Sequence, residues 1–198
     1  MGKIFCLIGK SCSGKDSILS SLQDKLKFKT FVSYTTRPKR DGEEEGKEYH
    51  FIDDQEMLGL KKTNKIIESR SYNTGQGRWT YATVKENDFD LKENNYLAIV
   101  DIDGSKSFIQ YFGENNVIGI YIDVNDADRI RRAIIREQNQ SSPDYVELCR
   151  RFIADTEAFD LSLLKDTKHV VVKNKQNDFN TCINTIILII NTTNAILD

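Results

Sequence analysis

The chain has 198 residues, of which 39% are apolar and 29% are charged, a composition ordinary for one compact soluble domain. Its 28 basic and 30 acidic residues give a net charge of −2, which excludes a general polyanion-binding protein and predicts no nucleic-acid polymer as a partner. The longest apolar run, residues 186–190, is too short to span a bilayer, so no membrane association is expected.

The start of the chain and its cysteines predict a cytoplasmic protein. Residues 1–8 lack the apolar region and cleavage site of a signal peptide and lead directly into a strand. The four cysteines form no C-x-x-C pair and have no metal-ligand spacing, so we expect reduced thiols.

A glycine-bounded loop follows the first apolar run of the chain. Residues 9–15 match the phosphate-binding pattern G-x-x-x-x-G-K, and a helix is expected after them over about 16–25. Glycines let the backbone approach an anion, successive N–H groups point at it beside a helix N-terminus, and the lysine reaches the outer phosphates. The pattern therefore predicts a nucleoside triphosphate site formed by Gly9, Lys10, Ser11, Cys12, Ser13, Gly14, Lys15, Asp16 and Ser17.

One position departs from the phosphate-loop pattern. Ser or Thr usually follows the lysine and provides a hydroxyl ligand to Mg²⁺, whereas this chain has Asp16. A carboxylate is a hard oxygen ligand, so Asp16 is a candidate for holding Mg²⁺ directly or through water.

The rest of the chain alternates between apolar strands and helices. Continuous apolar strands separated by helices predict an α/β fold with a parallel sheet covered on both faces. Besides the loop helix, the expected elements are strands at 3–8, 96–100, 117–122 and 170–172 and a C-terminal helix over about 178–191.

Two segments do not fit this core pattern. Residues 33–83 are rich in charge, Tyr and Thr, and they predict a small inserted lobe of short strands. Residues 126–156 predict a charged pair of helices, with Ser142 or Ser141 as the N-cap of the second helix before Pro143.

The inserted segment carries a second group of polar residues. Arg37 and Arg40 lie three apart after a run of hydroxyl residues, and Tyr49 follows. Two guanidinium groups with a phenol and a hydroxyl suit a phosphate monoester, and Glu68 with nearby hydroxyls suits the N–H edge of guanine. Without other signals, the same residues would also be typical of a charged, solvent-exposed surface. Because a phosphate loop is present in the same chain, the pattern favours a binding site.

At these residues the chain resembles the guanylate kinase family, which phosphorylates GMP with ATP. The resemblance rests on S-x-T-T-R-x-x-R at 33–40, followed by G-E and then G-x-x-Y-x-F, and it extends over nearly the whole chain. It implies a P-loop kinase core with helices on both faces, an inserted nucleotide-binding lobe and a helical lid. The implied single domain has a core at 1–32, 84–125 and 157–198, a GMP-binding lobe at 33–83 and a lid at 126–156.

The resemblance also implies roles for individual residues. The GMP phosphate would be held by Ser33, Arg37, Arg40, Tyr49 and Tyr81, and the guanine would be read by Glu68, Thr83 and Asp103. Lys15, Arg132, Arg136 and Arg151 would be the catalytic residues. Asp101 would hold Mg²⁺ through water, together with Asp16. ATP and GMP are then the expected partners, Mg²⁺ the cofactor, and the protein a monomer or homodimer.

Several positions depart from the family pattern and leave alternatives open. Lys10, Cys12 and Asp16 are unusual in the loop, and residues 71–79 are longer than the usual turn. The Lys-Asp-Ser ending of the loop resembles ribose 1,5-bisphosphate phosphokinases, so a diverged kinase for another phosphomonoester is one alternative. The other is a non-catalytic guanylate-kinase-like binding module, although such modules typically lack the loop lysine and the magnesium carboxylate that are present here.

Overall fold

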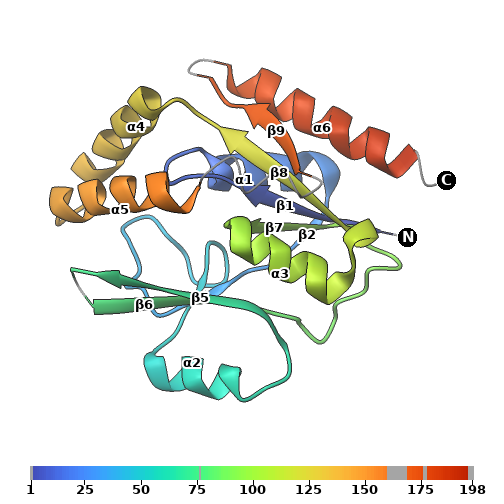
Figure 1. The fold of residues 1–198 in the computed structure, drawn as a ribbon, viewed down its shortest axis with the longest axis horizontal. Helices are drawn as coiled ribbons and strands as arrows, with labels where there is room; N and C mark the ends of the chain where they lie inside the picture. Colours follow the sequence, from blue (N-terminus) through green and yellow to red (C-terminus); the bar gives the residue numbers. More distant parts are fainter. Residues whose placement is uncertain (1, 76, 160–168, 176–177, 196–198) are drawn as a thin grey trace.

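The computed structural model describes residues 2–75, 77–159, 169–175 and 178–195. It shows a mixed α/β fold with a central five-stranded sheet in the order β2-β7-β1-β8-β9 (Figure 1). All neighbouring strands in this sheet are parallel, as the sequence predicts. The strands are β1 (Ile4–Ile8), β2 (Lys29–Thr30), β7 (Tyr96–Val100), β8 (Val117–Asp123) and β9 (His169–Lys173).

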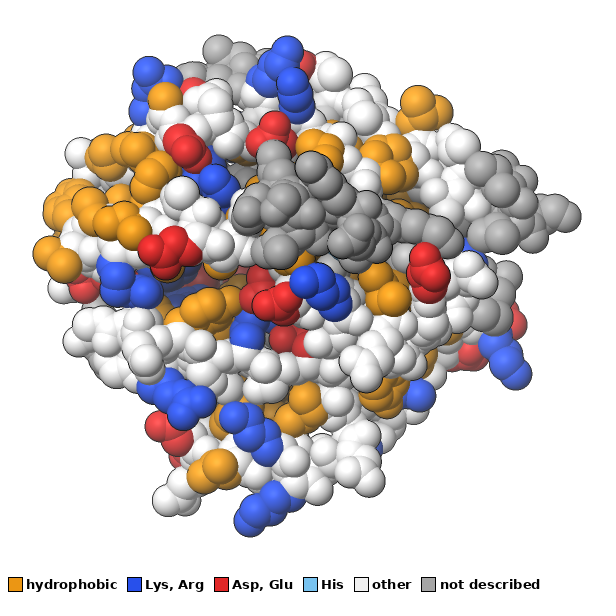
Figure 2. All heavy atoms as spheres, viewed as in Figure 1, with side chains coloured by type: hydrophobic (Ala, Val, Ile, Leu, Met, Phe, Trp, Pro, Cys, Tyr) orange, Lys and Arg blue, Asp and Glu red, His pale blue; other side chains and the backbone are white. Residues whose placement is uncertain are grey.

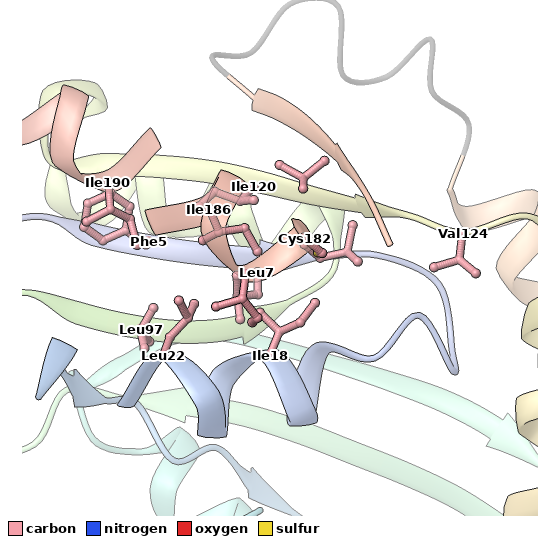
Figure 3. Packing of buried hydrophobic residues seen from close by; sticks show 13 residues of the cluster. Phe5, Leu7, Ile18, Leu22, Leu97, Ile120, Val124, Cys182, Ile186 and Ile190 are labelled. Atoms are coloured by element: carbon pink, nitrogen blue, oxygen red, sulfur yellow. The ribbon is translucent and has the colours of Figure 1, made fainter. Parts of the chain in front are cut away.

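The middle strand is buried on both faces because helices cover the sheet from both sides. Every residue of β1 is buried, which explains its uninterrupted apolar sequence. Helices α1 (Lys15–Leu26) and α6 (Phe179–Ala195) pack on one face, where Phe5 and Leu7 meet the apolar side of each helix (Figure 3). Helix α3 (Ile102–Phe112) packs on the other face through Phe108.

A second sheet lies beside the first and has the order β4-β3-β6-β5. Strands β3 (Tyr34–Thr35) and β4 (His50–Phe51) are short, as predicted for this segment. The prediction is wrong for β5 (Ile66–Thr74) and β6 (Gly77–Val84), which form a long antiparallel hairpin. Helix α2 (Asp54–Lys61) is also unpredicted, although Asp53 and Glu56 form a capping box at its start.

The charged stretch after β8 forms two helices, as predicted: α4 (Asp126–Gln138) and α5 (Tyr145–Ala158). The predicted N-cap of α5 is wrong. Asp144 is the N-cap, and its side chain accepts the N–H of Glu147 at 2.9 Å. Ser141 lies outside the helix, and its N–H donates to the carboxylate of Asp41 at 2.6 Å.

Helix α3 and the 3₁₀ turn η1 (Glu114–Asn116) are further unpredicted elements. Asp101 ends the apolar run of β7 and is the N-cap of α3, since its Oδ1 accepts the N–H of Gly104 at 2.7 Å. Across the described part of the chain, no helix combines the length and apolar character that crossing a bilayer requires.

The packing of α6 gives a direct test of the core. Ile186 is fully buried against the sheet, so Ile186→Ala should lower the free energy of unfolding by about 3 kcal/mol. Leu188 is 65% exposed on the same helix, so Leu188→Ala should cost less than about 0.5 kcal/mol. Urea denaturation of both variants measures the difference, and equal losses would contradict this placement of the helix.

Candidate active site

The phosphate-loop sequence forms a turn between β1 and α1. Gly14, the residue before the helix, has φ of 93°, a conformation that favours glycine. The ammonium group of Lys15 folds back over the loop and donates to the carbonyls of Gly9 at 2.7 Å and Lys10 at 3.0 Å. Burial lowers the pKa of Lys15, while the nearby carboxylates of Asp16 and Asp155 act in the opposite direction.

Residues distant in the sequence hold the loop from one side. The side-chain amide of Asn174 donates to the carbonyl of Ser13 at 2.8 Å. Arg132 donates to the carbonyls of Ser13 at 3.5 Å and Asn174 at 3.3 Å, so this predicted catalytic arginine lies against the loop backbone. A Cβ atom on Gly14 would be 2.8 Å from the Asn174 amide, so the contact also requires glycine there.

A carboxylate from α5 holds the loop from the other side. Asp155 accepts the N–H of Ser11 at 2.7 Å and pairs with Arg129, also at 2.7 Å. The Arg129 side chain is 1% exposed, and it further donates to the Ser11 carbonyl and pairs with Asp126. The sequence does not predict this Arg129–Asp155 pair, because the two residues lie on separate charged helices and no fixed spacing along the chain links them.

Four predicted arginines line one cavity between the loop after β3 and helices α4 and α5. They are Arg37, Arg40, Arg136 and Arg151. Burial and the neighbouring charges of Arg151, Arg37 and Arg136 lower the pKa of Arg40 to about 10. The Nε atom of Arg136 is buried without a hydrogen-bond partner among the described residues. This clustering of arginines makes the cavity a candidate anion-binding site.

Aromatic residues form a wall beside these arginines. The Arg37 guanidinium lies 5.4 Å from the ring centre of Tyr49, and the Tyr49 ring is 5.6 Å from that of Tyr81. Burial, followed by the charge of Asp16, raises the pKa of Tyr49 to about 12, so its hydroxyl stays a donor at neutral pH. Arg37 is itself held by Glu43 at 2.7 Å.

The β5–β6 hairpin brings the predicted base-reading residues together. Its register pairs Glu68 with Thr83 and Arg70 with Tyr81 on the same face. The Thr83 hydroxyl donates to Glu68 at 2.7 Å and shares a hydrogen bond of 2.8 Å with Ser33. Arg70, which the sequence analysis missed, pairs with Glu68 at 2.8 Å; the alternation of strand residues starting at Glu68 would have identified it.

The two predicted magnesium ligands differ in their surroundings. Oδ1 of Asp101 accepts a hydrogen bond from the N–H of Gly104. Oδ2 accepts a hydrogen bond from the hydroxyl of Tyr72 at 2.7 Å and forms an ion pair with Arg70 at 3.2 Å. Asp16 is exposed in the first turn of α1. Among the described residues no cluster of three or more acidic, His or Cys side chains could hold a metal. An Mg²⁺ held mainly by substrate phosphates needs only one such carboxylate, and Asp16 fits that requirement better.

The remaining predicted residues lie around this centre. Ser17 and Asp16 line a further cavity of about 590 Å³ with Ser33 and Tyr49. Among the described residues, no hydrogen bond or ion pair joins Asp103 to the group around Glu68; its side chain is 89% exposed and pairs with Lys106 at 3.1 Å.

One cavity of about 470 Å³ connects the phosphate loop with the hairpin. Lys15, Tyr49, Tyr81, Asp101 and Arg151 line it, and it lies between α5 and the β5–β6 hairpin. Figure 2 shows basic and acidic side chains around the hollow between these two layers. Because Arg151 lines both this cavity and the arginine cavity, the two are neighbours within one candidate site.

Comparisons with known proteins agree with this geometry. The family model described as guanylate kinase matches residues 1–181. The chain belongs to the guanylate kinase family. A relative named guanylate kinase from Anaplasma phagocytophilum is 31% identical over 141 residues, which cover 68% of this chain and 63% of the relative. Another, from Mycoplasma mobile, is 28% identical over 188 residues and covers 89% of this chain and 91% of the relative.

The fold resembles that of a solved member of the family. The crystal structure of guanylate kinase from Anaplasma phagocytophilum matches with a TM-score of 0.64 and 25% sequence identity. The match covers 98% of this chain and 85% of that protein. The expected family and fold class are therefore confirmed, and the roles assigned to individual site residues stay predictions.

The Arg129–Asp155 pair can be tested by stability measurements. Asp155→Ala should lower the free energy of unfolding by about 3 kcal/mol, because the buried Arg129 guanidinium keeps only the exposed carboxylate of Asp126. The double variant Arg129→Met with Asp155→Ala should lose less than Asp155→Ala alone, since no buried charge is left uncompensated. Urea denaturation of the unaltered protein and the two variants measures this, and a larger loss in the double variant than in Asp155→Ala would contradict the pairing.

Proposed function

We propose that the protein transfers the terminal phosphoryl group of ATP to GMP, and that dGMP is also an acceptor. Family membership supports this activity. The observation that carries it is the placement of Arg151, which lines both the cavity containing Lys15 and the cavity containing Arg37 and Arg40. A donor phosphate at the loop and an acceptor phosphate at the arginines would therefore be adjacent.

The acceptor side would work through positioning. Arg40, together with Arg37 and Tyr49, offers donors to a phosphate monoester, and the charges of Arg136 and Arg151 lie nearby. A phosphate oxygen is already ionised at neutral pH, so no dedicated general base is needed. Holding this oxygen in line with the donor phosphate accounts for most of the catalysis expected in phosphoryl transfer.

The donor side would require a rearrangement at the loop. The Lys15 ammonium group now binds two loop carbonyls, and it would leave them to pair with the outer phosphates of ATP. The N–H of Ser11, now bound by Asp155, belongs to the same loop. When bound, Mg²⁺ would neutralise phosphate charge, with Asp16 as its protein ligand.

The base side rests on the hairpin. Glu68, Thr83 and Ser33 form a connected, buried group of acceptors and hydroxyls, and Arg70 stands between Glu68 and the cavity. Asp103 now pairs with Lys106 and would have to leave that partner to take part in base recognition. The alternative of a binding module is less favoured because Lys15 and the arginine cluster are both in place.

A coupled ADP-release assay with ATP and Mg²⁺ tests the proposed function. We expect turnover with GMP and dGMP, and none with AMP, CMP, UMP or ribose 1,5-bisphosphate. Lys15→Ala should reduce turnover by about 100-fold or more while circular dichroism shows an intact fold, because the outer phosphates lose their cation. Turnover only with another acceptor would replace GMP, and unchanged turnover in Lys15→Ala would overturn the assignment of the loop.

A second prediction concerns the acceptor phosphate. Arg40→Ala should raise the KM for GMP by about 10- to 100-fold with a smaller effect on the KM for ATP, because a charged hydrogen-bond donor is removed from the arginine cavity. Lys61→Ala removes an exposed positive charge from α2, outside this cavity, and should change neither constant more than about twofold. Steady-state kinetics of both variants measure the two KM values. An equal rise in the KM for GMP in both variants would show that a positive charge outside the cavity has the same effect as Arg40.

A further inference from the structure

Arg70 is the charged residue of the hairpin that faces the cavity. Its side chain is 19% exposed, whereas the neighbouring Glu68 side chain is 2% exposed. Arg70 lines the 470 Å³ cavity together with Lys15, Tyr49 and Tyr81, and Glu68 is not among the residues that line it. A molecule entering this cavity therefore meets the guanidinium of Arg70 before the carboxylate behind it.

The guanidinium is held in one orientation by groups from separate elements. Its Nη1 atom lies 2.8 Å from Oε1 of Glu68 on β5, and its Nε atom lies 3.2 Å from Oδ2 of Asp101 after β7. Its central carbon lies 5.5 Å from the centre of the Tyr81 ring. Burial opposes the charge on Arg70, but Glu68 and Asp101 outweigh that effect and raise the pKa of the guanidinium.

A fixed guanidinium presents only donors to a ligand. Arginine has five N–H donors and no acceptor, so the part of a nucleotide that it contacts must carry acceptors. The edge of guanine that carries O6 and N7 has two acceptors side by side, and arginine donates to this edge in other proteins. In Arg70 the Nη1 atom is buried beside Glu68 and the Nε atom faces Asp101, so Nη2 is the nitrogen that can donate to a ligand. Adenine has an amino group in place of O6, and this donor would face the donors of Arg70.

We propose that Arg70 is a specificity-determining residue whose Nη2 atom, the nitrogen not facing Glu68 or Asp101, donates to O6 of a 6-oxopurine in the acceptor nucleotide. This inference rests on the proposed function and names the chemical feature of the acceptor that the site selects. Glu68 and Asp101 act as its supports, because together they fix the plane of the guanidinium. The Tyr81 ring, which faces Arg70 across the hairpin, closes one side of the same pocket.

The test compares three acceptors that differ only in the base. GMP and IMP both carry O6, whereas the monophosphate of 2,6-diaminopurine riboside keeps the 2-amino group of GMP but has an amino group in place of O6. Arg70→Ala should lower kcat/KM for GMP and IMP alike by about 10- to 100-fold, because each loses a charged hydrogen bond. The diaminopurine nucleotide should change less than about threefold, so the preference for the oxo group over the amino group collapses.

Two matched variants complete the experiment. Arg78→Ala removes an exposed arginine from the same hairpin and should leave all three values unchanged. Arg70→Lys keeps the positive charge without the planar fork, so GMP and IMP should again lose more than the diaminopurine nucleotide. If Arg70→Ala does not fold, as judged by circular dichroism, Arg70→Lys carries the test.

The outcomes separate this inference from the proposed function. If the unaltered protein phosphorylates GMP and the Arg70 variants lose activity equally with all three acceptors, Arg70 acts only through Asp101 and the inference is overturned. If the unaltered protein phosphorylates none of them, the proposed function fails. Calorimetric binding of the three nucleotides without ATP then decides the inference alone: preferential binding of GMP and IMP that Arg70→Ala abolishes supports it, and equal or absent binding overturns it.

Discussion

Repulsion between guanidinium groups is the constraint on which the arrangement of this site depends. Three arginines are each balanced by a carboxylate: Arg37 by Glu43, Arg70 by Glu68 and Asp101, and Arg129 by Asp155. For Arg40, burial and then the charges of Arg151, Arg37 and Arg136 instead lower the pKa of the guanidinium. Positive charge is thereby concentrated in one cavity, where a phosphate group would relieve it.

The parallel sheet brings these groups to one place. The phosphate loop follows β1 and Asp101 follows β7, so both lie at the carboxyl edge of adjacent strands. Asn174, directly after β9, and Asp155, on α5, hold the loop backbone from two directions. Movement of α5 and movement of the loop are therefore physically linked, because one carboxylate binds both the Ser11 amide and Arg129.

The hairpin provides the other half of the site, and its chemistry differs from what the family pattern implies. The carboxylate of Glu68, which the family resemblance assigns to guanine recognition, is covered by Arg70, and Arg70 also pairs with Oδ2 of Asp101. With Arg70 in front of Glu68, the face of the hairpin presents hydrogen-bond donors to the cavity, where the family pattern implies a hydrogen-bond acceptor. Asp16 on α1 is an exposed carboxylate beside the phosphate loop.

Local sequence patterns determined the elements whose signal lies within a few residues. The glycine-bounded loop, the buried strands and the two charged helices follow from periodicity and from the backbone freedom of glycine, and they are present in the structure. The N-cap of α5 was predicted wrongly because Ser141 binds Asp41, one hundred residues away. Helix α2 was missed although its capping box is local, since no expectation of a helix was attached to that lobe.

What the tertiary structure alone decided is which charges meet. The sequence by itself determined a phosphate loop, a pair of arginines after it and a family resemblance, because each is a short pattern of residue types. It did not determine that Arg70 covers Glu68, that Asp155 binds Ser11 or that Arg132 lies on the loop backbone. An ion pair depends on distance and burial in three dimensions, and strands and helices far apart in the chain set both.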